Sequence, residues 1–160
     1  MPTYPQKTFA LMIEDTVKSL FANIKEKANE VYRTLGRGYS EAVYQRALSV
    51  EFQSLGIPHD LEVTMSVPYK GHVVGQVRSD IILRGATPLI LETKATAAAL
   101  KPEERWQLSR YLKLQDIPFG ALINFSQIGT ANAAQVEFFV YSNNEFYIYN
   151  IETGLSTIMA

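Results

Sequence analysis

Residues 77–94 have the sequence VRSDIILRGATPLILETK, in which two apolar runs enclose a short turn. Charged residues interrupt both runs: Asp80 lies inside the first, and Glu92 and Lys94 close the second. A charge buried in such a strand is costly unless it is paired or bound to a metal. The strand period of two places Glu92 and Lys94 on one face and Thr93 on the other. These charges therefore mark a candidate site.

The two runs are predicted to pair as neighbouring antiparallel strands. Residues 73–83 form the first strand, residues 88–94 the second, and residues 84–87 the turn between them. In that register Asp80 lies close to Glu92, so two carboxylates and a lysine converge on one patch.

The paired carboxylates have two interpretations. Like charges repel and need a cation, and oxygen atoms are the ligands that Mg²⁺ prefers. A lysine beside the metal could then orient a water or stabilise charge on a phosphoryl oxygen. The ordinary alternative is a strand pair held by ion pairs, Asp80 with Lys94 or Glu92 with Arg78. The residues Glu92-Thr93-Lys94 form the only Asp/Glu-x-Lys triplet of the chain, which favours the metal site.

The rest of the chain predicts a mixed β-sheet flanked by helices, an α/β protein of the α+β type. The element order is α-α-β-β-β-α-β, followed by extra strands at the C-terminal end. Predicted helices span residues 13–35, 41–55 and 102–114, and further strands span 61–67, 119–125, 136–141 and 146–151. With no repeat or linker in the sequence, residues 1–160 are expected to form a single domain.

Composition excludes several classes of protein. The chain has 160 residues and no cysteine, which rules out a disulfide framework, a thiolate zinc site and a cysteine-ligated iron–sulfur cluster. Its apolar runs are shorter than the ~20 residues that span a bilayer, so we expect a soluble intracellular protein without a membrane partner. The net charge of −1 counts mildly against a nucleic-acid partner, although positive charge can be confined to one groove.

Several short motifs together resemble a known family. The segment Gly38-Tyr39-Ser40-Glu41-Ala42-Val43-Tyr44 matches a Gly-x-x-Glu-x-x-Tyr signature. It is followed in order by Val67-Pro68-Tyr69-Lys70-Gly71, Val77-Arg78-Ser79-Asp80, Leu91-Glu92-Thr93-Lys94, Gln107-Leu108-Ser109-Arg110-Tyr111 and Leu122-Ile123-Asn124-Phe125. In this order and spacing the chain resembles the GxxExxY family of the PD-(D/E)XK nuclease superfamily, over about residues 17–126. The resemblance implies a restriction-endonuclease-like core, with residues 130–160 as a C-terminal β extension.

The resemblance also implies roles for five residues. Asp80 and Glu92 would be metal ligands, with the backbone carbonyl of Thr93 as a third. Lys94 would be the catalytic lysine. Glu41 would be the first-helix acid that approaches the metal directly or through water. The expected metal is Mg²⁺, with Mn²⁺ able to substitute.

A second group of residues is expected to hold the substrate. Gln107 and Tyr111 resemble the Gln-x-x-x-Tyr helix of RecB-like members, which helps hold the site and the substrate strand. The resemblance implies that Gln107 belongs to the catalytic set and that Tyr111 binds the substrate. Five cations surround the site in sequence, and the first four are predicted to contact nucleic acid: Arg78, Lys101, Arg105, Arg110 and Lys113. The alternative for the helix cations is a solvated face balanced by Glu103 and Glu104.

The sequence thus predicts a Mg²⁺-dependent phosphodiesterase that acts on DNA, with RNA as the second choice. One rival is a nucleic-acid-binding module that has the fold without the chemistry. Another is an assembly module, in which the aromatic strands after residue 130 form an interface between copies of the chain. The aromatic strands are expected to belong to the core or to extend the sheet rather than to stack bases.

Overall fold

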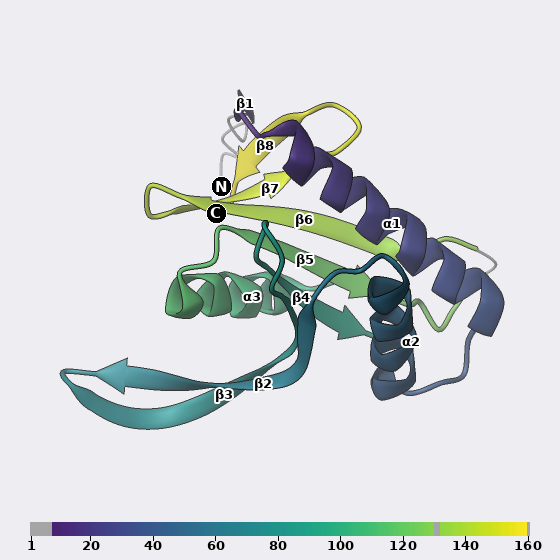
Figure 1. The fold of residues 1–160 in the computed structure, drawn as a ribbon, viewed down its shortest axis with the longest axis horizontal. Helices are drawn as coiled ribbons and strands as arrows, with labels where there is room; N and C mark the ends of the chain where they lie inside the picture. The colour runs from purple at the N-terminus through teal and green to yellow at the C-terminus, as the bar shows by residue number, and fades with distance from the viewer. Residues whose placement is uncertain (1–7, 130–131, 160) are drawn as a thin grey trace, which may run out of the picture.

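The computed structural model describes residues 8–129 and 132–159, which form one mixed β-sheet with helices on both faces (Figure 1). The helices are α1 (Asp15–Leu35), α2 (Glu41–Ser54) and α3 (Pro102–Gln115). The strands are β1 (Thr8–Ala10), β2 (His59–Tyr69), β3 (His72–Leu83), β4 (Leu89–Lys94), β5 (Phe119–Asn124), β6 (Gln135–Ser142), β7 (Glu145–Tyr149) and β8 (Leu155–Ile158). The predicted fold class is confirmed.

The sheet has the order β1-β8-β7-β6-β5-β4-β3-β2. β4 and β5 are parallel because the crossover through α3 separates them, and the other neighbouring strands are antiparallel. The predicted elements all appear within a few residues of their expected bounds. The short strands β1 and β8 were not predicted, and they extend the sheet beyond β7.

Two apolar clusters fix the helices to opposite faces of the sheet. One cluster joins α1 and α2 to the odd-numbered residues of the central strands, for example Phe21 with Leu91 and Ile123. The other joins α3 to the even-numbered residues, for example Leu108 with Ile90. Each central strand is therefore buried on both sides, which explains its continuous apolar sequence.

The aromatic residues of the C-terminal strands belong to these clusters. Phe138 and Tyr149 pack in the cluster under α1, where the ring of Phe138 stacks on Phe21 at a centroid distance of 4.4 Å. Phe139 is buried in the cluster under α3. These rings serve the core, as the sequence analysis expected. Within the described residues, no helix is both long and apolar enough to cross a membrane.

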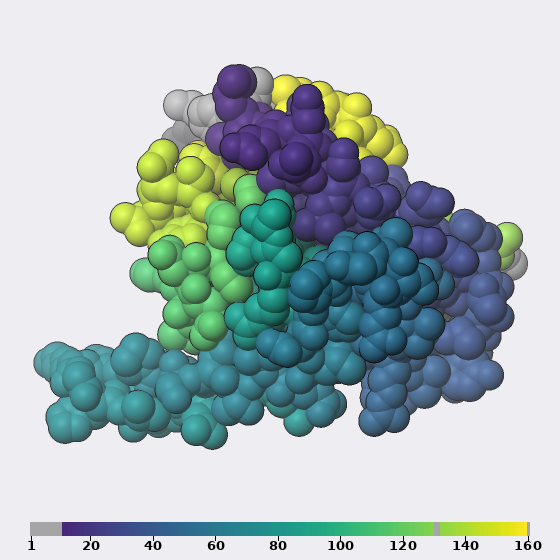
Figure 2. All heavy atoms as spheres, in the orientation of Figure 1, coloured from purple at the N-terminus to yellow at the C-terminus, as the bar shows by residue number. Residues whose placement is uncertain are grey.

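The hairpin of β2 and β3 extends well beyond the rest of the sheet, and we call its outer part, residues 64–78, the arm (Figure 1). Figure 2 shows the arm as a narrow projection from the body of the molecule. Near its tip Val73 and Val74 are 65% and 61% exposed. The base of the hairpin continues into the central sheet, where β3 pairs with β4.

Close packing of α3 on β5 gives a test of this arrangement. A Cβ atom on Gly120 would lie 3.2 Å from Leu108 Cδ2 and 3.3 Å from Leu112 Cδ1. We expect Gly120→Val to lower the free energy of unfolding by about 1–3 kcal/mol, because the helix must move away from the sheet. The matched control is Gly75→Val in the arm, where a Cβ atom meets nothing within 4 Å. Urea denaturation measures both, and equal stability of the two variants would contradict the packing of α3.

Candidate active site

Strand register brings the two predicted carboxylates together. Ile81 pairs with Leu91 and Ile82 with Ile90, so the next position along β3, Asp80, lies opposite Glu92. The backbone N–H of Asp80 donates a hydrogen bond to Glu92 Oε1 at 3.2 Å. The predicted juxtaposition of Asp80 and Glu92 is therefore present in the structure.

Asp80 lies at an irregularity in the sheet. Val77 and Ile82 both pack in the α3 cluster, although they are five residues apart and strict alternation would put them on opposite faces. On the neighbouring strand, Glu62 is left out of the ladder at the same level and has a φ of 52°. Such backbone is strained for a residue with a side chain and is frequent at functional sites. Glu62 and Asp80 are both missing from the ladder although the register on either side of them is the same, so the irregularity is confined to this pair.

The carboxylate of Asp80 is held by Thr93. Asp80 Oδ2 accepts the backbone N–H of Thr93 at 2.8 Å and its hydroxyl at 3.0 Å. The N–H and C=O of a strand residue point toward the same neighbouring strand. The Thr93 carbonyl therefore also faces the opening between β3 and β4, where the Asp80 carboxylate lies.

Charge and burial oppose each other at Glu92. The side chain is only 5% exposed. Burial, and next the negative charge of Asp80, raise the pKa of Glu92 well above its ordinary value, while the Asp80 N–H and Lys94 act in the opposite direction. Two carboxylates held this closely with a backbone carbonyl beside them form an oxygen-rich set that a divalent cation fits.

Glu41 is positioned by a loop on the other side of the site. It is exposed at the first residue of α2. The preceding loop is fixed by Gly38, whose N–H donates to Gln127 Oε1 at 2.8 Å, and by the Tyr44 hydroxyl, which donates to the Gly36 carbonyl at 2.6 Å. Among the described residues, no cluster of three or more acidic, histidine or cysteine side chains is able to hold a metal. Glu41 therefore does not form such a cluster with Asp80 and Glu92, and its role in the site stays a prediction.

Two further residues support the site and were not predicted. Gln45, one helical turn after Glu41, donates a hydrogen bond from its side chain to the Asp80 carbonyl at 3.1 Å. Asn124, buried at the end of β5, accepts the Thr96 N–H at 3.1 Å and so holds the loop after Lys94. The sequence gives only a weak signal for Gln45, because its hydrogen-bond partner is a backbone carbonyl on a strand distant in sequence.

Gln107 and Tyr111 approach the carboxylates from α3. Tyr111 is 6% exposed, and its pKa is raised first by burial and then by the charges of Glu92 and Asp80. A hydrogen bond from Gln107 acts in the opposite direction on the tyrosine. Tyr111 also packs in the α3 cluster with Ile82 and Ile90, which lie two residues from Asp80 and Glu92, so it lies on the same side of the sheet as this part of the site.

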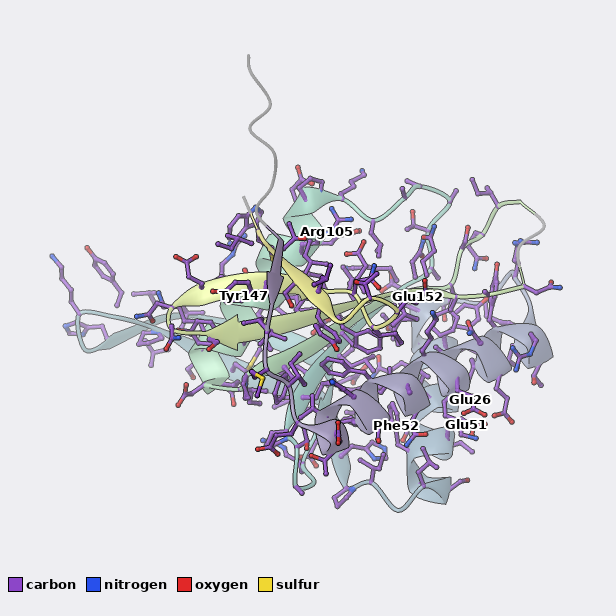
Figure 3. The ribbon with its side chains drawn as sticks, turned by 90° about the horizontal axis from the view of Figure 1, so that it is seen from above. Glu26, Glu51, Phe52, Arg105, Tyr147 and Glu152 are labelled. Carbon is purple, nitrogen blue, oxygen red and sulfur yellow. The ribbon has the colours of Figure 1, made fainter. Side chains whose placement is uncertain are left out.

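The predicted substrate cations have different surroundings. Arg105, labelled in Figure 3, makes two hydrogen bonds of 2.7 Å to the carboxylate of Glu137 on β6. Its partner is thus Glu137, whereas the sequence suggested Glu103 or Glu104. The other three, Arg78, Lys101 and Arg110, are exposed. Arg105 would have to leave an ion pair to contact a phosphate.

Comparisons with known proteins relate the chain to a family over most of its length. The model of a family described as the PD-(D/E)XK nuclease superfamily matches residues 18–136, which include all the candidate site residues. No curated protein is significantly similar to the chain. Among solved structures, the crystal structure of SSO0001 has 17% sequence identity and a TM-score of 0.42, over 72% of this chain and 62% of that one. This chain thus spans less than two thirds of the length of that protein.

The raised pKa of Glu92 predicts how pH affects the metal-free protein. Between the ordinary glutamate pKa and the raised one, the folded protein binds more protons than the unfolded chain. The free energy of unfolding therefore falls as the pH rises through that window. Glu92→Gln keeps an oxygen acceptor for the Asp80 N–H and removes the charge, so it should melt at a higher temperature than the parent at neutral pH.

Thermal unfolding from pH 4 to 9 in EDTA measures this difference. Glu26→Gln, a change at an exposed carboxylate on α1, is the control and should keep the slope of the parent. If Glu92→Gln follows the same pH dependence as the parent, Glu92 is not the group responsible.

Proposed function

The chain belongs to the PD-(D/E)XK nuclease superfamily, and from this membership and the site geometry we propose that it hydrolyses phosphodiester bonds with a divalent metal ion. Within the superfamily we assign it to the GxxExxY type on the segment from Gly38 to Tyr44. We further propose that residues 1–160 act as a single domain and that DNA is the substrate.

One observation carries the proposal. Asp80 and Glu92 face each other across two buried strands, at the place where the backbone of β3 leaves its regular pattern. An ordinary ion pair would bring Lys94 against Asp80 or Arg78 against Glu92. Neither pair is among the salt bridges of the described residues. The arrangement favours a cation between the carboxylates over a strand pair closed by its own charges.

The residues present fit a magnesium ion. Asp80, Glu92 and the Thr93 carbonyl would hold it, and Mn²⁺ would substitute because it accepts the same oxygen ligands. When bound, the metal would supply a Lewis acid and lower the pKa of a water molecule for attack on phosphorus.

The other side chains prepare this place for a phosphodiester. Thr93 fixes one oxygen of Asp80, and Gln45 of α2 fixes the backbone carbonyl of Asp80. Lys94 follows Glu92 on the same strand face, where its ammonium group can orient a water or donate to a phosphate oxygen as negative charge develops. Gln107 would act through Tyr111, which borders the carboxylates.

Single substitutions test the catalytic assignment. We expect Asp80→Asn and Glu92→Gln to abolish cleavage, because each removes a metal ligand, and Lys94→Ala to slow it by about 10²–10³-fold. Lys18→Ala, a lysine exposed on α1, is the control and should cleave like the parent. The assay uses single- and double-stranded DNA and RNA with Mg²⁺, Mn²⁺ or EDTA, and circular dichroism checks that each variant is folded.

Two results would contradict the proposal. One is that no substrate is cut with either metal and calorimetry detects no metal binding. The other is cleavage that persists in Asp80→Asn and Glu92→Gln, which would place the chemistry elsewhere. Salt-dependent nucleic-acid binding without cleavage would favour the non-catalytic module.

A further inference from the structure

A groove of about 790 Å³ lies between the arm and α3. The arm contributes Val67, Pro68 and Val77, and α3 contributes residues from Glu103 to Leu114. On α3 the lining residues Gln107, Arg110, Tyr111 and Leu114 recur at steps of three and four, so one helix face looks into the groove. Pockets of about 300–1,000 Å³ enclose ligands of a few hundred daltons, the size of one or two nucleotides.

The groove lies beside the candidate active site. Tyr111 lines it and packs in the same apolar cluster as Ile82 and Ile90, each two residues from one of the carboxylates, Asp80 and Glu92. Gln107, which hydrogen-bonds Tyr111, lines it as well. A chain molecule lying in the groove would therefore pass beside the strands that carry the two carboxylates.

The wall formed by the arm is apolar. Val67, Pro68 and Val77 have no side-chain polar atoms, and Leu114 faces them from α3. In a duplex the flat faces of the bases are covered by stacking, and only the backbone and the base edges remain available. Unpaired bases expose those flat faces, which can pack against apolar side chains. The wall therefore suits an unpaired strand better than a duplex.

The charge along α3 changes from negative at its start to positive toward its end, and the positive part suits a phosphate backbone. Glu103 and Glu104 lie at the start of the helix, and the Glu104 carboxylate is already occupied by the Lys101 backbone N–H at 2.8 Å. Two turns further on, Arg110 and Lys113 are exposed at the groove. Neither cation has an acidic partner among the salt bridges of the described residues.

We propose that the groove between the arm and α3 binds an unpaired segment of polynucleotide, with bases against the arm and phosphates beside Arg110 and Lys113. The proposal rests on the proposed nuclease function and names its substrate class. It assigns a role to the arm, which would form one wall of the binding groove for unpaired nucleic acid. A duplex could enter only after its bases unstacked, at a cost of about a few kcal/mol per step.

Binding without metal separates this proposal from catalysis. Fluorescence anisotropy in EDTA compares a single-stranded oligonucleotide with the duplex of the same sequence, as DNA and as RNA. We expect at least tenfold tighter binding of the single strand, and the DNA and RNA arms show which sugar is preferred. Equal or tighter binding of the duplex would overturn the proposal.

Charge removal tests the backbone contacts. Arg110→Gln with Lys113→Gln should weaken single-strand binding roughly 25-fold at 0.1 M salt and reduce the salt slope by about 1.4, for two phosphate contacts at about 0.7 each. The control is Lys18→Gln with Arg33→Gln on α1, which removes the same charge from the opposite face of the sheet. Arg33 lies in the last turn of its helix, as Lys113 does in α3. Equal losses in the two double variants would overturn the proposal.

The apolar wall is tested by neighbouring residues of the arm. Val67→Asp places a carboxylate in the groove, whereas Ser66→Asp places one on the exposed position before it. We expect Val67→Asp alone to weaken single-strand binding by more than tenfold. Leu114→Asp repeats the test from α3 if the arm variant does not fold, and equal effects at residues 66 and 67 would contradict the assignment.

The cleavage assay keeps the two proposals distinguishable. If cleavage depends on Asp80 and Glu92 but the groove variants bind and cut like the parent, the groove assignment is wrong and the nuclease assignment stands. If single strands bind through the groove and are never cut, the groove assignment stands and the catalytic one is wrong. A change of oligomeric state in Val67→Asp, measured by sedimentation, would identify a second copy of the chain as the occupant and overturn the proposal.

Discussion

The repulsion between Asp80 and Glu92 is the constraint on which this structure depends. Each carboxylate adjoins an apolar run of its strand, residues 81–83 on β3 and residues 89–91 on β4, and Glu92 is almost completely buried. The protein offsets this cost with donors: Thr93 gives two hydrogen bonds to Asp80, and the Asp80 N–H gives one to Glu92. Despite these donors the pKa of Glu92 stays well above its ordinary value, first because of burial and then because of the charge of Asp80. A site that stays unfavourable in the metal-free protein is one that a cation stabilises on binding.

Helices on opposite faces of the sheet converge on this pair because β3 is irregular at that point. In a regular strand, successive side chains alternate, and a residue facing α3 would offer nothing to α2. At Asp80, where the ladder is interrupted, the backbone carbonyl accepts a hydrogen bond from Gln45 of α2, while the charge of its carboxylate affects Tyr111 of α3. Glu62 has the matching irregularity on β2. Asp80 thus contacts α2 through its backbone carbonyl and influences α3 through its charge.

Much of the fold and the pairing of the carboxylates could be predicted from the sequence, because the alternation of strands and the helical spacing of apolar residues are both visible in it. The register of Asp80 with Glu92 follows from a short turn between two apolar runs, and the helices follow from apolar residues at steps of three and four. The irregularity at Asp80 could not be predicted, since it is seen only in the packing of Val77 and Ile82 against α3, a helix distant in sequence. The hydrogen bond from the Thr93 hydroxyl to Asp80 could not be predicted either, because strand alternation places Thr93 on the face opposite to Glu92. Partners distant in sequence, such as Glu137 for Arg105 and β1 for β8, leave no local pattern.

The arm is a two-stranded ribbon that would not be stable on its own. A two-stranded ribbon is marginally stable in water, and this one leaves Val73 and Val74 largely exposed near its tip. Its base is secured, because β3 continues into the central sheet and Met65 and Val77 pack in the α3 cluster. The strand that carries Asp80 is therefore the same strand that forms one wall of the groove. A molecule in the groove would therefore contact Val77 on the strand that carries Asp80, three residues before that carboxylate.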